Sequence, residues 1–78
     1  MLRTEQSQWS KLPLKRWYVY DDERPAEDRI IGTITYSPYS PDVDKYKCWV
    51  KGEQVGTGYE FHDAILIHDI LNANRKSA

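Results

Sequence analysis

Apolar and polar residues alternate along two early segments of the chain, and this period of two predicts β-strands. Residues 16–20 form the first predicted strand, rich in aromatic and β-branched side chains. Residues 29–36 form the second, in which Gly32 indicates a bulge or a close approach of another backbone. The acidic segment 21–28 lies between them. We therefore expect an antiparallel pair joined by this segment.

A second hairpin is predicted over residues 46–59, with Gly52 and Glu53 as its two-residue turn. In that register one face carries three cross-strand pairs, Tyr46 with Tyr59, Cys48 with Thr57, and Val50 with Val55. The other face places Trp49 opposite Gly56, an aromatic–glycine pairing that stabilises strands.

Helical spacing replaces the alternation over about residues 62–73. One broad apolar arc should pack on the hairpin, and its members are Ala64, Leu66, Ile67, Ile70 and Leu71. Ile65 projects from the edge of this arc. It is either covered by the N-terminal segment, through Trp9, or exposed as a contact for a partner.

The segment 1–15 shows no clean period, and Pro13 excludes a regular helix through it. We expect an extended N-terminal arm, followed by one domain over residues 16–76. The predicted fold is α+β, a three- to four-stranded antiparallel sheet of two hairpins packed on one C-terminal helix. A chain of 78 residues supports only a small core. A partner or a homodimer would add stability.

Charge is unevenly distributed, although the net charge is only −1. Residues 21–44 hold seven acidic residues against two basic ones. This balance lacks the strong positive charge of a duplex-DNA-binding domain and suits protein partners. The acidic residues Asp21, Asp22 and Glu23 form either a solvated connection or a patch that meets a basic partner.

The residue types of catalytic sites occur, but without the required spacing. Cys48 is the single cysteine and falls on the predicted core face, where it acts as a small hydrophobe. His62 and His68 lie six positions apart, on different sides of a helix, and cannot share a metal ion. We expect no catalytic, cofactor or metal site and no enzyme activity. No apolar run reaches the length of a membrane span or secretory signal, so a cytoplasmic protein is expected.

Lys47, Trp49 and Lys51 form the most informative cluster, because they share the outer face of the predicted hairpin. Trp49 has three interpretations: it covers Gly56, contacts a protein, or stacks on a base while the lysines meet phosphates. The order of strand, glycine-bearing turn, strand and helix in residues 46–71 resembles AP2-type and phage-integrase arm-binding domains. That resemblance implies DNA binding by the sheet face, through Lys47 and Lys51.

We interpret the chain as a small non-enzymatic protein-binding module, of the kind found among accessory or inhibitor proteins of phages and mobile elements. The alternative is a nucleic-acid-binding domain that uses its outer sheet face. No membrane contact is expected. The predicted partner-binding residues are Lys47, Trp49, Lys51, Ile65, Asp21, Asp22 and Glu23.

Overall fold

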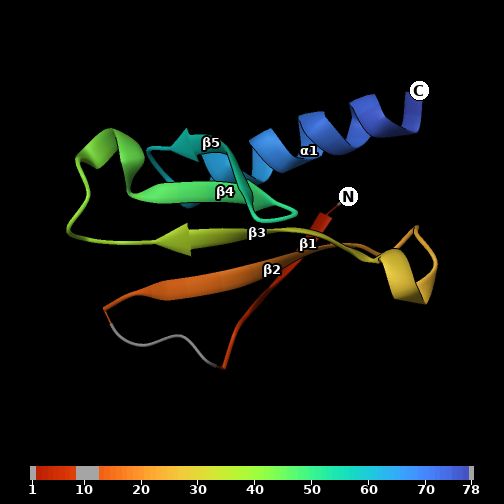
Figure 1. Cartoon of the computed structure of the whole chain (residues 1–78), viewed down its shortest axis with the longest axis horizontal. Coiled ribbons are helices and arrows are strands. Elements are labelled where there is room, and N and C mark those ends of the chain that lie inside the picture. The colour runs from red at the N-terminus through yellow and green to blue at the C-terminus, as the bar shows by residue number, and fades with distance from the viewer. Residues whose placement is uncertain (1, 9–12, 78) are drawn as a thin grey trace.

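The computed structural model describes residues 2–8 and 13–77, without the side chains of residue 42 and residues 75–77. Over these residues the chain forms five strands, two short 3-10 helices and one α-helix (Figure 1). The strands are β1 (Leu2–Gln6), β2 (Lys15–Asp21), β3 (Ile30–Tyr36), β4 (Tyr46–Val50) and β5 (Glu53–Gly58). The helices are η1 (Ala26–Asp28), η2 (Asp42–Asp44) and α1 (Phe61–Ser77).

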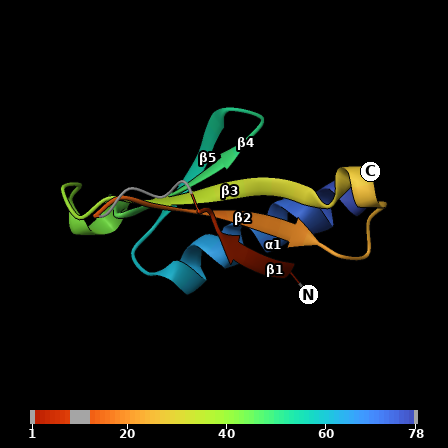
Figure 2. The same ribbon diagram turned by 90° about the horizontal axis from the view of Figure 1, so that it is seen from below.

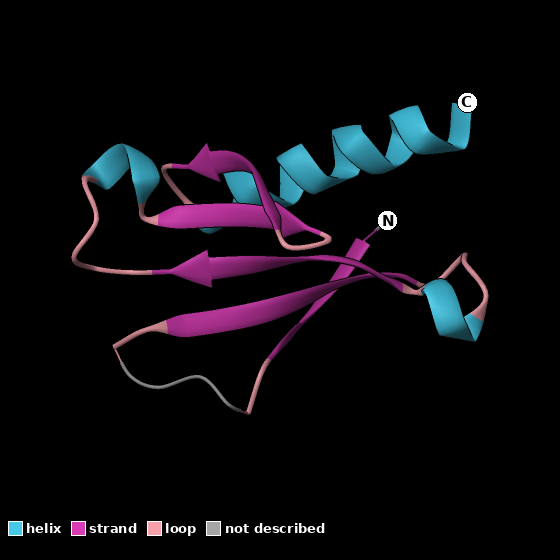
Figure 3. Cartoon of the chain, viewed as in Figure 1, coloured by secondary structure: helices cyan, strands magenta, loops and turns pink. Residues whose placement is uncertain are grey.

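The five strands make one antiparallel sheet in sequence order, β1-β2-β3-β4-β5 (Figure 3). Helix α1 lies against one face of the sheet, and no described element crosses the other (Figure 2). The predicted α+β class, with its C-terminal helix, is therefore confirmed. We call the face that packs on α1 the inner face and the opposite one the outer face.

The sheet has five strands rather than the three or four expected, because part of the expected N-terminal arm forms β1. Leu2 pairs with Asp21 and Gln6 with Trp17, which places β1 at the edge beside β2. Arg3 strengthens this pairing through a 2.9 Å ion pair from its Nε to Asp22. Trp9, one of the two alternatives for covering Ile65, lies outside the described residues.

The core lies between α1 and the middle strands. Its buried apolar members are Val19, Ile31, Ile34, Cys48 and Ala64. An aromatic cluster continues this core at the N-terminal end of the helix. There the rings of Trp17 and Phe61 are 4.7 Å apart, and Tyr46 lies 5.8 Å from Phe61. Such tilted pairs add stability beyond their buried area.

The helix is rotated relative to the apolar arc expected from its spacing. Leu66 and Ile70, expected in the core, are 52% and 61% exposed. Ala64, His68 and Asn72 point inward instead and are buried. The expectation was wrong for Leu66 and Ile70 because the two polar side chains find hydrogen-bond partners on the sheet, which makes their burial tolerable.

The second hairpin forms, but its predicted register is wrong by two residues next to the turn and by one residue farther along the strands. The turn residues are Lys51 and Gly52, whose φ angles of 52° and 80° identify a type I′ turn. Val50 therefore pairs with Glu53. Val55 is left unpaired as a bulge in β5, because the ladder passes from the Trp49–Gln54 pair to the Cys48–Gly56 pair.

This register brings glycines under the helix. Gly56 and Gly58 take the inner-face positions opposite Cys48 and Tyr46. A Cβ at Gly56 would lie 3.1 Å from the Cδ1 atom of Ile67, and one at Gly58 would lie 3.1 Å from the backbone nitrogen of Ala64. The short distance between α1 and β5 thus explains why these glycines, and not Thr57 and Tyr59, face inward.

Candidate functional site

An open groove of about 710 Å³ lies on the outer face, between the tip of the β4–β5 hairpin and the β2–β3 connection. We call it the outer groove. Side chains of β3 and β4 contribute Ile30, Thr33, Thr35 and Trp49 to it. Its charged lining residues are Arg16, Arg24, Lys51, Glu27 and Asp28. The groove thus combines an aromatic side chain with charges of both signs.

Trp49 is held in one orientation by the sheet. Its indole Nε1–H donates a 2.9 Å hydrogen bond to Oγ1 of Thr35 on the neighbouring strand. Trp49 pairs with Thr33 on one side and with Gln54 on the other. The predicted pairing with Gly56 is therefore wrong, which removes the reason to regard Trp49 as the cover of a strand glycine.

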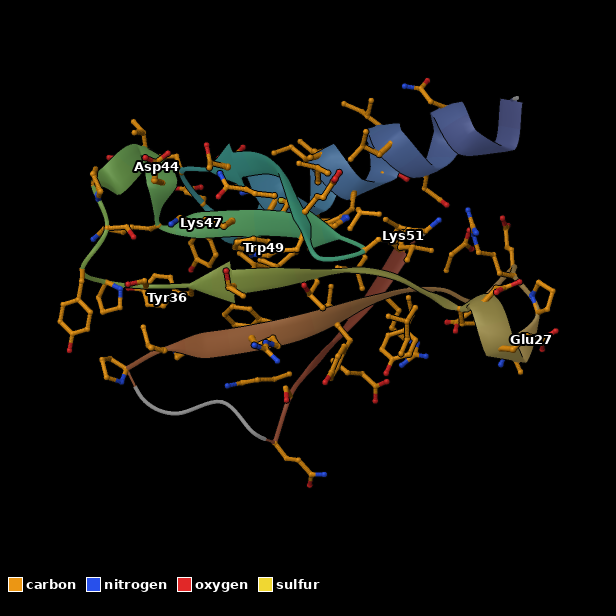
Figure 4. All side chains as sticks on the ribbon, viewed as in Figure 1. Glu27, Tyr36, Asp44, Lys47, Trp49 and Lys51 are labelled. Carbon is orange, nitrogen blue, oxygen red and sulfur yellow. The ribbon has the colours of Figure 1, made fainter. Side chains whose placement is uncertain are left out.

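The two lysines predicted beside Trp49 occupy different surroundings (Figure 4). Lys51 lies at the exposed hairpin tip and lines the outer groove. Lys47 is half-buried further back along β4, paired with Thr35 and Thr57, and is not part of the groove lining. The structure therefore brings Trp49 and Lys51 into one groove and leaves Lys47 beside it.

The three acidic residues predicted as one patch point to different partners. Asp21 is only 1% exposed and accepts a 2.8 Å hydrogen bond from Nδ2 of Asn72. Asp22 is exposed and bonds Arg3, which lowers the pKa of the Asp22 carboxyl. Glu23 is exposed, and its backbone N–H donates to Asp21. The buried carboxylate of Asp21 thus links β2 to α1 through its hydrogen bond with Asn72. Of the three acidic residues, only Asp22 and Glu23 reach the surface.

A polar cluster fastens the β2–β3 connection to the helix. Arg24 donates a 2.6 Å hydrogen bond from Nη2 to Oδ1 of Asn72. Its Nε lies 3.6 Å from Oδ2 of Asp21. These contacts fix the side chain of Arg24, which lines the outer groove, and connect it to the C-terminal half of α1.

His68 makes the second polar connection from the helix to the sheet. Its Nε2 lies 3.0 Å from the carbonyl oxygen of Thr33. Because a carbonyl only accepts hydrogen bonds, Nε2 carries the proton. Burial lowers the pKa of His68, although the bond to Thr33 opposes that effect. The ring lies directly against Gly32, where a side chain would collide with it.

Ile65 and Cys48 both lie away from the outer groove. Ile65, expected to project from the edge of the apolar arc, is half-buried and packs against the core. Cys48 is fully buried, and its thiol lies 3.5 Å from the carbonyl oxygen of Ala64. Burial raises the pKa of this thiol to about 11, which keeps it protonated and unreactive.

A second cavity, of about 440 Å³, opens on the helix side of the hairpin tip. We call it the inner pocket, and Val55, Leu71 and Asn74 contribute to its lining. Three of its other lining residues, Ile31, Val50 and Lys51, also line the outer groove.

Sequence reasoning did not identify most of the outer groove. Arg16, Arg24 and Ile30 join Trp49 only through the pairing of β2, β3 and β4. Alternation assigns Ile30 to the apolar side of its strand, with Ile34 and Tyr36. The extra residue between the Tyr20–Ile30 and Val19–Gly32 pairs turns Ile30 to the outer face instead, where it is 55% exposed. The acids Glu27 and Asp28 belong to the same connection as the predicted acidic residues but were not singled out.

Comparison with known protein families, curated proteins and solved structures gave no significant match for this chain. Among the side chains that the structure describes, no three histidine, cysteine, aspartate or glutamate residues come together as metal ligands. Within the same described part of the chain, no helix has the length and apolar content needed to cross a bilayer.

Proposed function

We propose that the chain is a non-enzymatic protein-binding module whose contact surface is the outer groove. The observation that carries this proposal is the fixed position of Trp49 in an open groove with charges of both signs. A tryptophan held by a hydrogen bond loses little conformational freedom on binding. Tryptophan and arginine dominate the energetics of protein interfaces, and Arg16 and Arg24 line the same groove.

The acidic side chains of the groove favour a protein over a nucleic acid. Glu27 and Asp28 lie on the wall formed by η1, on the far side of the groove from Lys51. They would repel a phosphate backbone, whereas a protein can place opposite charges against both walls. Such a module suits an accessory or inhibitor protein, whose action consists of occupying a partner's surface.

Nucleic-acid binding is the second candidate, because Trp49 lies between Lys47 of β4 and Lys51 of the hairpin turn. A base stacked on the indole and phosphates beside the lysines would use this arrangement. Gel shifts with single- and double-stranded DNA and RNA at low salt test it. A shift that Trp49→Ala weakens would favour this candidate over the protein-binding proposal.

The protein-binding proposal is tested with variants that change the groove but not the core. Ile30→Lys places a charge on an exposed groove position. Val43→Lys makes the same kind of change at a 62% exposed residue of η2, outside the groove lining. The immobilised chain and both variants are incubated with lysate of the producing or host cell, and captured proteins are quantified by mass spectrometry.

We expect at least one protein that the wild-type chain and Val43→Lys retain and that Ile30→Lys loses. The same protein should lose affinity for Lys51→Glu. A set of captured proteins that is identical for the wild-type chain, Ile30→Lys and Lys51→Glu would refute the groove as the contact surface.

A further inference from the structure

Strand β3 and the hairpin beside it separate beyond their last ladder pair. The β3–β4 ladder ends at the pair of Thr33 and Trp49, and the hairpin turns at Lys51 and Gly52. β3 nevertheless extends back to Ile30, which pairs with Tyr20 of β2. Ile30 thus has a partner on the β2 side, and neither Ile30 nor Ile31 has one in the ladder on the β4 side. We call the gap between this unpaired edge of β3 and the hairpin tip the notch.

The outer groove and the inner pocket open on the two faces of this notch. They share Ile31, Val50 and Lys51, which lie where the notch meets the hairpin. Side chains of an extended strand point alternately to the two faces of a sheet. One strand in the notch would therefore place one side chain in the outer groove and the next in the inner pocket.

Lys51 gives an independent indication that the hairpin tip has a role beyond turning the chain. It adopts φ = 52°, a left-handed conformation that glycine, asparagine and aspartate adopt far more readily than lysine. Strained residues of this kind persist mainly at binding and active sites. The long cationic side chain of this residue lines both cavities.

Charges at the two ends of the notch are opposite in sign. Lys51 stands at the hairpin end, and Glu27 lies at the far end on η1 (Figure 4). Asp28 lies next to Glu27 in the lining of the outer groove. A complementary segment would carry an acidic side chain near the hairpin and a basic one near η1, which sets its direction along β3.

We propose that the notch binds an extended segment of a partner protein, which adds to the edge of β3 as a further strand. The segment places an aliphatic side chain in the inner pocket, between Val55 and Leu71. It carries an acidic side chain beside Lys51 and a basic one towards Glu27. This inference rests on the proposed protein-binding function and specifies the form of the partner. Backbone hydrogen bonds would supply affinity and the pocket would supply selectivity, as in other cases of strand addition.

Selection from a phage-displayed library of random eight-residue peptides against the full chain tests this proposal. We expect the enriched peptides to share an aliphatic residue with an acidic residue close to it. A synthetic peptide of the enriched sequence should slow amide exchange within residues 30–32. N-methylation of its backbone at alternate positions should weaken binding at least tenfold, because each methyl group removes one donor of the added strand.

Two matched variants locate the peptide. Asn74→Trp fills the inner pocket from an exposed helix position, whereas Leu66→Trp adds the same bulk to α1 outside the pocket lining. We expect Asn74→Trp to weaken peptide binding at least tenfold and Leu66→Trp to change it less than twofold. Circular dichroism establishes that both variants keep the fold.

Three results would overturn strand addition: no enriched peptide, full affinity of the N-methylated peptide, or equal binding by Asn74→Trp and the wild-type chain. Its failure is distinguishable from that of the proposed function. If a lysate protein depends on Ile30 but not on Asn74, strand addition is refuted and the groove remains the contact surface. If capture is independent of Ile30 as well, the proposed function itself fails.

Discussion

The variant Gly32→Ala tests how β3, β4 and α1 fit together, because Gly32 lies where all three meet. A Cβ at this position would lie 2.5 Å from Cε1 of His68 and 2.6 Å from the carbonyl oxygen of Trp49. Both distances are far below van der Waals contact. The oxygen belongs to the backbone of a paired strand, and the imidazole is held by its bond to Thr33. Neither atom can withdraw without breaking an interaction.

The expected loss of stability follows from three contributions. Overpacking in a close-packed core costs about 1–3 kcal/mol. Displacement of the His68 ring forfeits a hydrogen bond worth about 1 kcal/mol. Replacing glycine reduces the entropy of the unfolded chain, which offsets about 0.4–1 kcal/mol. The net loss is about 2 kcal/mol, a large share of the roughly 3–5 kcal/mol that a core of this size supplies.

Urea unfolding, followed by tryptophan fluorescence, measures this loss as a lower midpoint. Gly56→Ala is the matched control, because the added Cβ would lie 3.1 Å from Cδ1 and 3.2 Å from Cγ2 of Ile67, distances that a small shift of this side chain can relieve. Its loss should stay below about 1 kcal/mol. The reasoning is refuted if Gly32→Ala unfolds at the same urea concentration as the wild-type chain, or at a higher one than Gly56→Ala.

Three further predictions concern single side chains. Lys51→Asn should raise the free energy of unfolding by about 0.5–1 kcal/mol, because asparagine accepts the left-handed conformation that lysine resists. The urea midpoint should rise accordingly, and an unchanged or lower midpoint would contradict this. The pKa of His68 is lowered below its usual 6.5, so below that pH the unfolded chain binds a proton that the native chain does not. Stability should therefore decline as pH falls below 6.5, and His68→Gln should flatten this dependence in urea titrations at several pH values. Cys48 should resist a thiol reagent in the native chain and react once urea unfolds it, since it is fully buried and burial raises its pKa to about 11; fast labelling of the native chain would show the site to be open.

Alternation of apolar and polar residues was sufficient to predict β2, β3 and β4, because these strands bury one face and expose the other. It was not sufficient for β1. In residues 2–6 only Leu2 is apolar, so the segment has no hydrophobic pattern. It joins the sheet through backbone pairing and the ion pair of Arg3 with Asp22, and such contacts depend on the position of β2.

The hairpin register was mispredicted because a local rule competed with a tertiary contact. Pairing Val50 with Val55 maximises apolar contact within the hairpin. The structure instead leaves Val55 unpaired and turns Gly56 and Gly58 inward, where Ile67 and Ala64 of the helix approach closely. That approach cannot be read from the hairpin sequence, since it depends on where α1 docks.

The candidate site was predictable only where its residues are neighbours in sequence. Trp49 and Lys51 are two positions apart in the predicted hairpin, so alternation placed them together. Arg24 and Ile30 reach the groove through strand pairing. Asn72 bonds Asp21, which lies 51 positions earlier, so the sequence near the helix gives no sign of this partner. A periodicity argument treats such a residue as exposed, although its hydrogen bonds make burial tolerable.

The sequence order of the strands also bears on how the chain folds. Each strand of a β1-β2-β3-β4-β5 sheet pairs with its immediate neighbour in the chain, so the sheet can grow by closing short loops, whose entropic cost is small. The bonds of Asn72 to Asp21 and Arg24 instead span about two thirds of the chain. They can form only after β2, its connection and the helix all exist. We therefore expect the polar cluster to close late in folding and to open first under native conditions, which would release the connection that carries Glu27 before the sheet itself loosens.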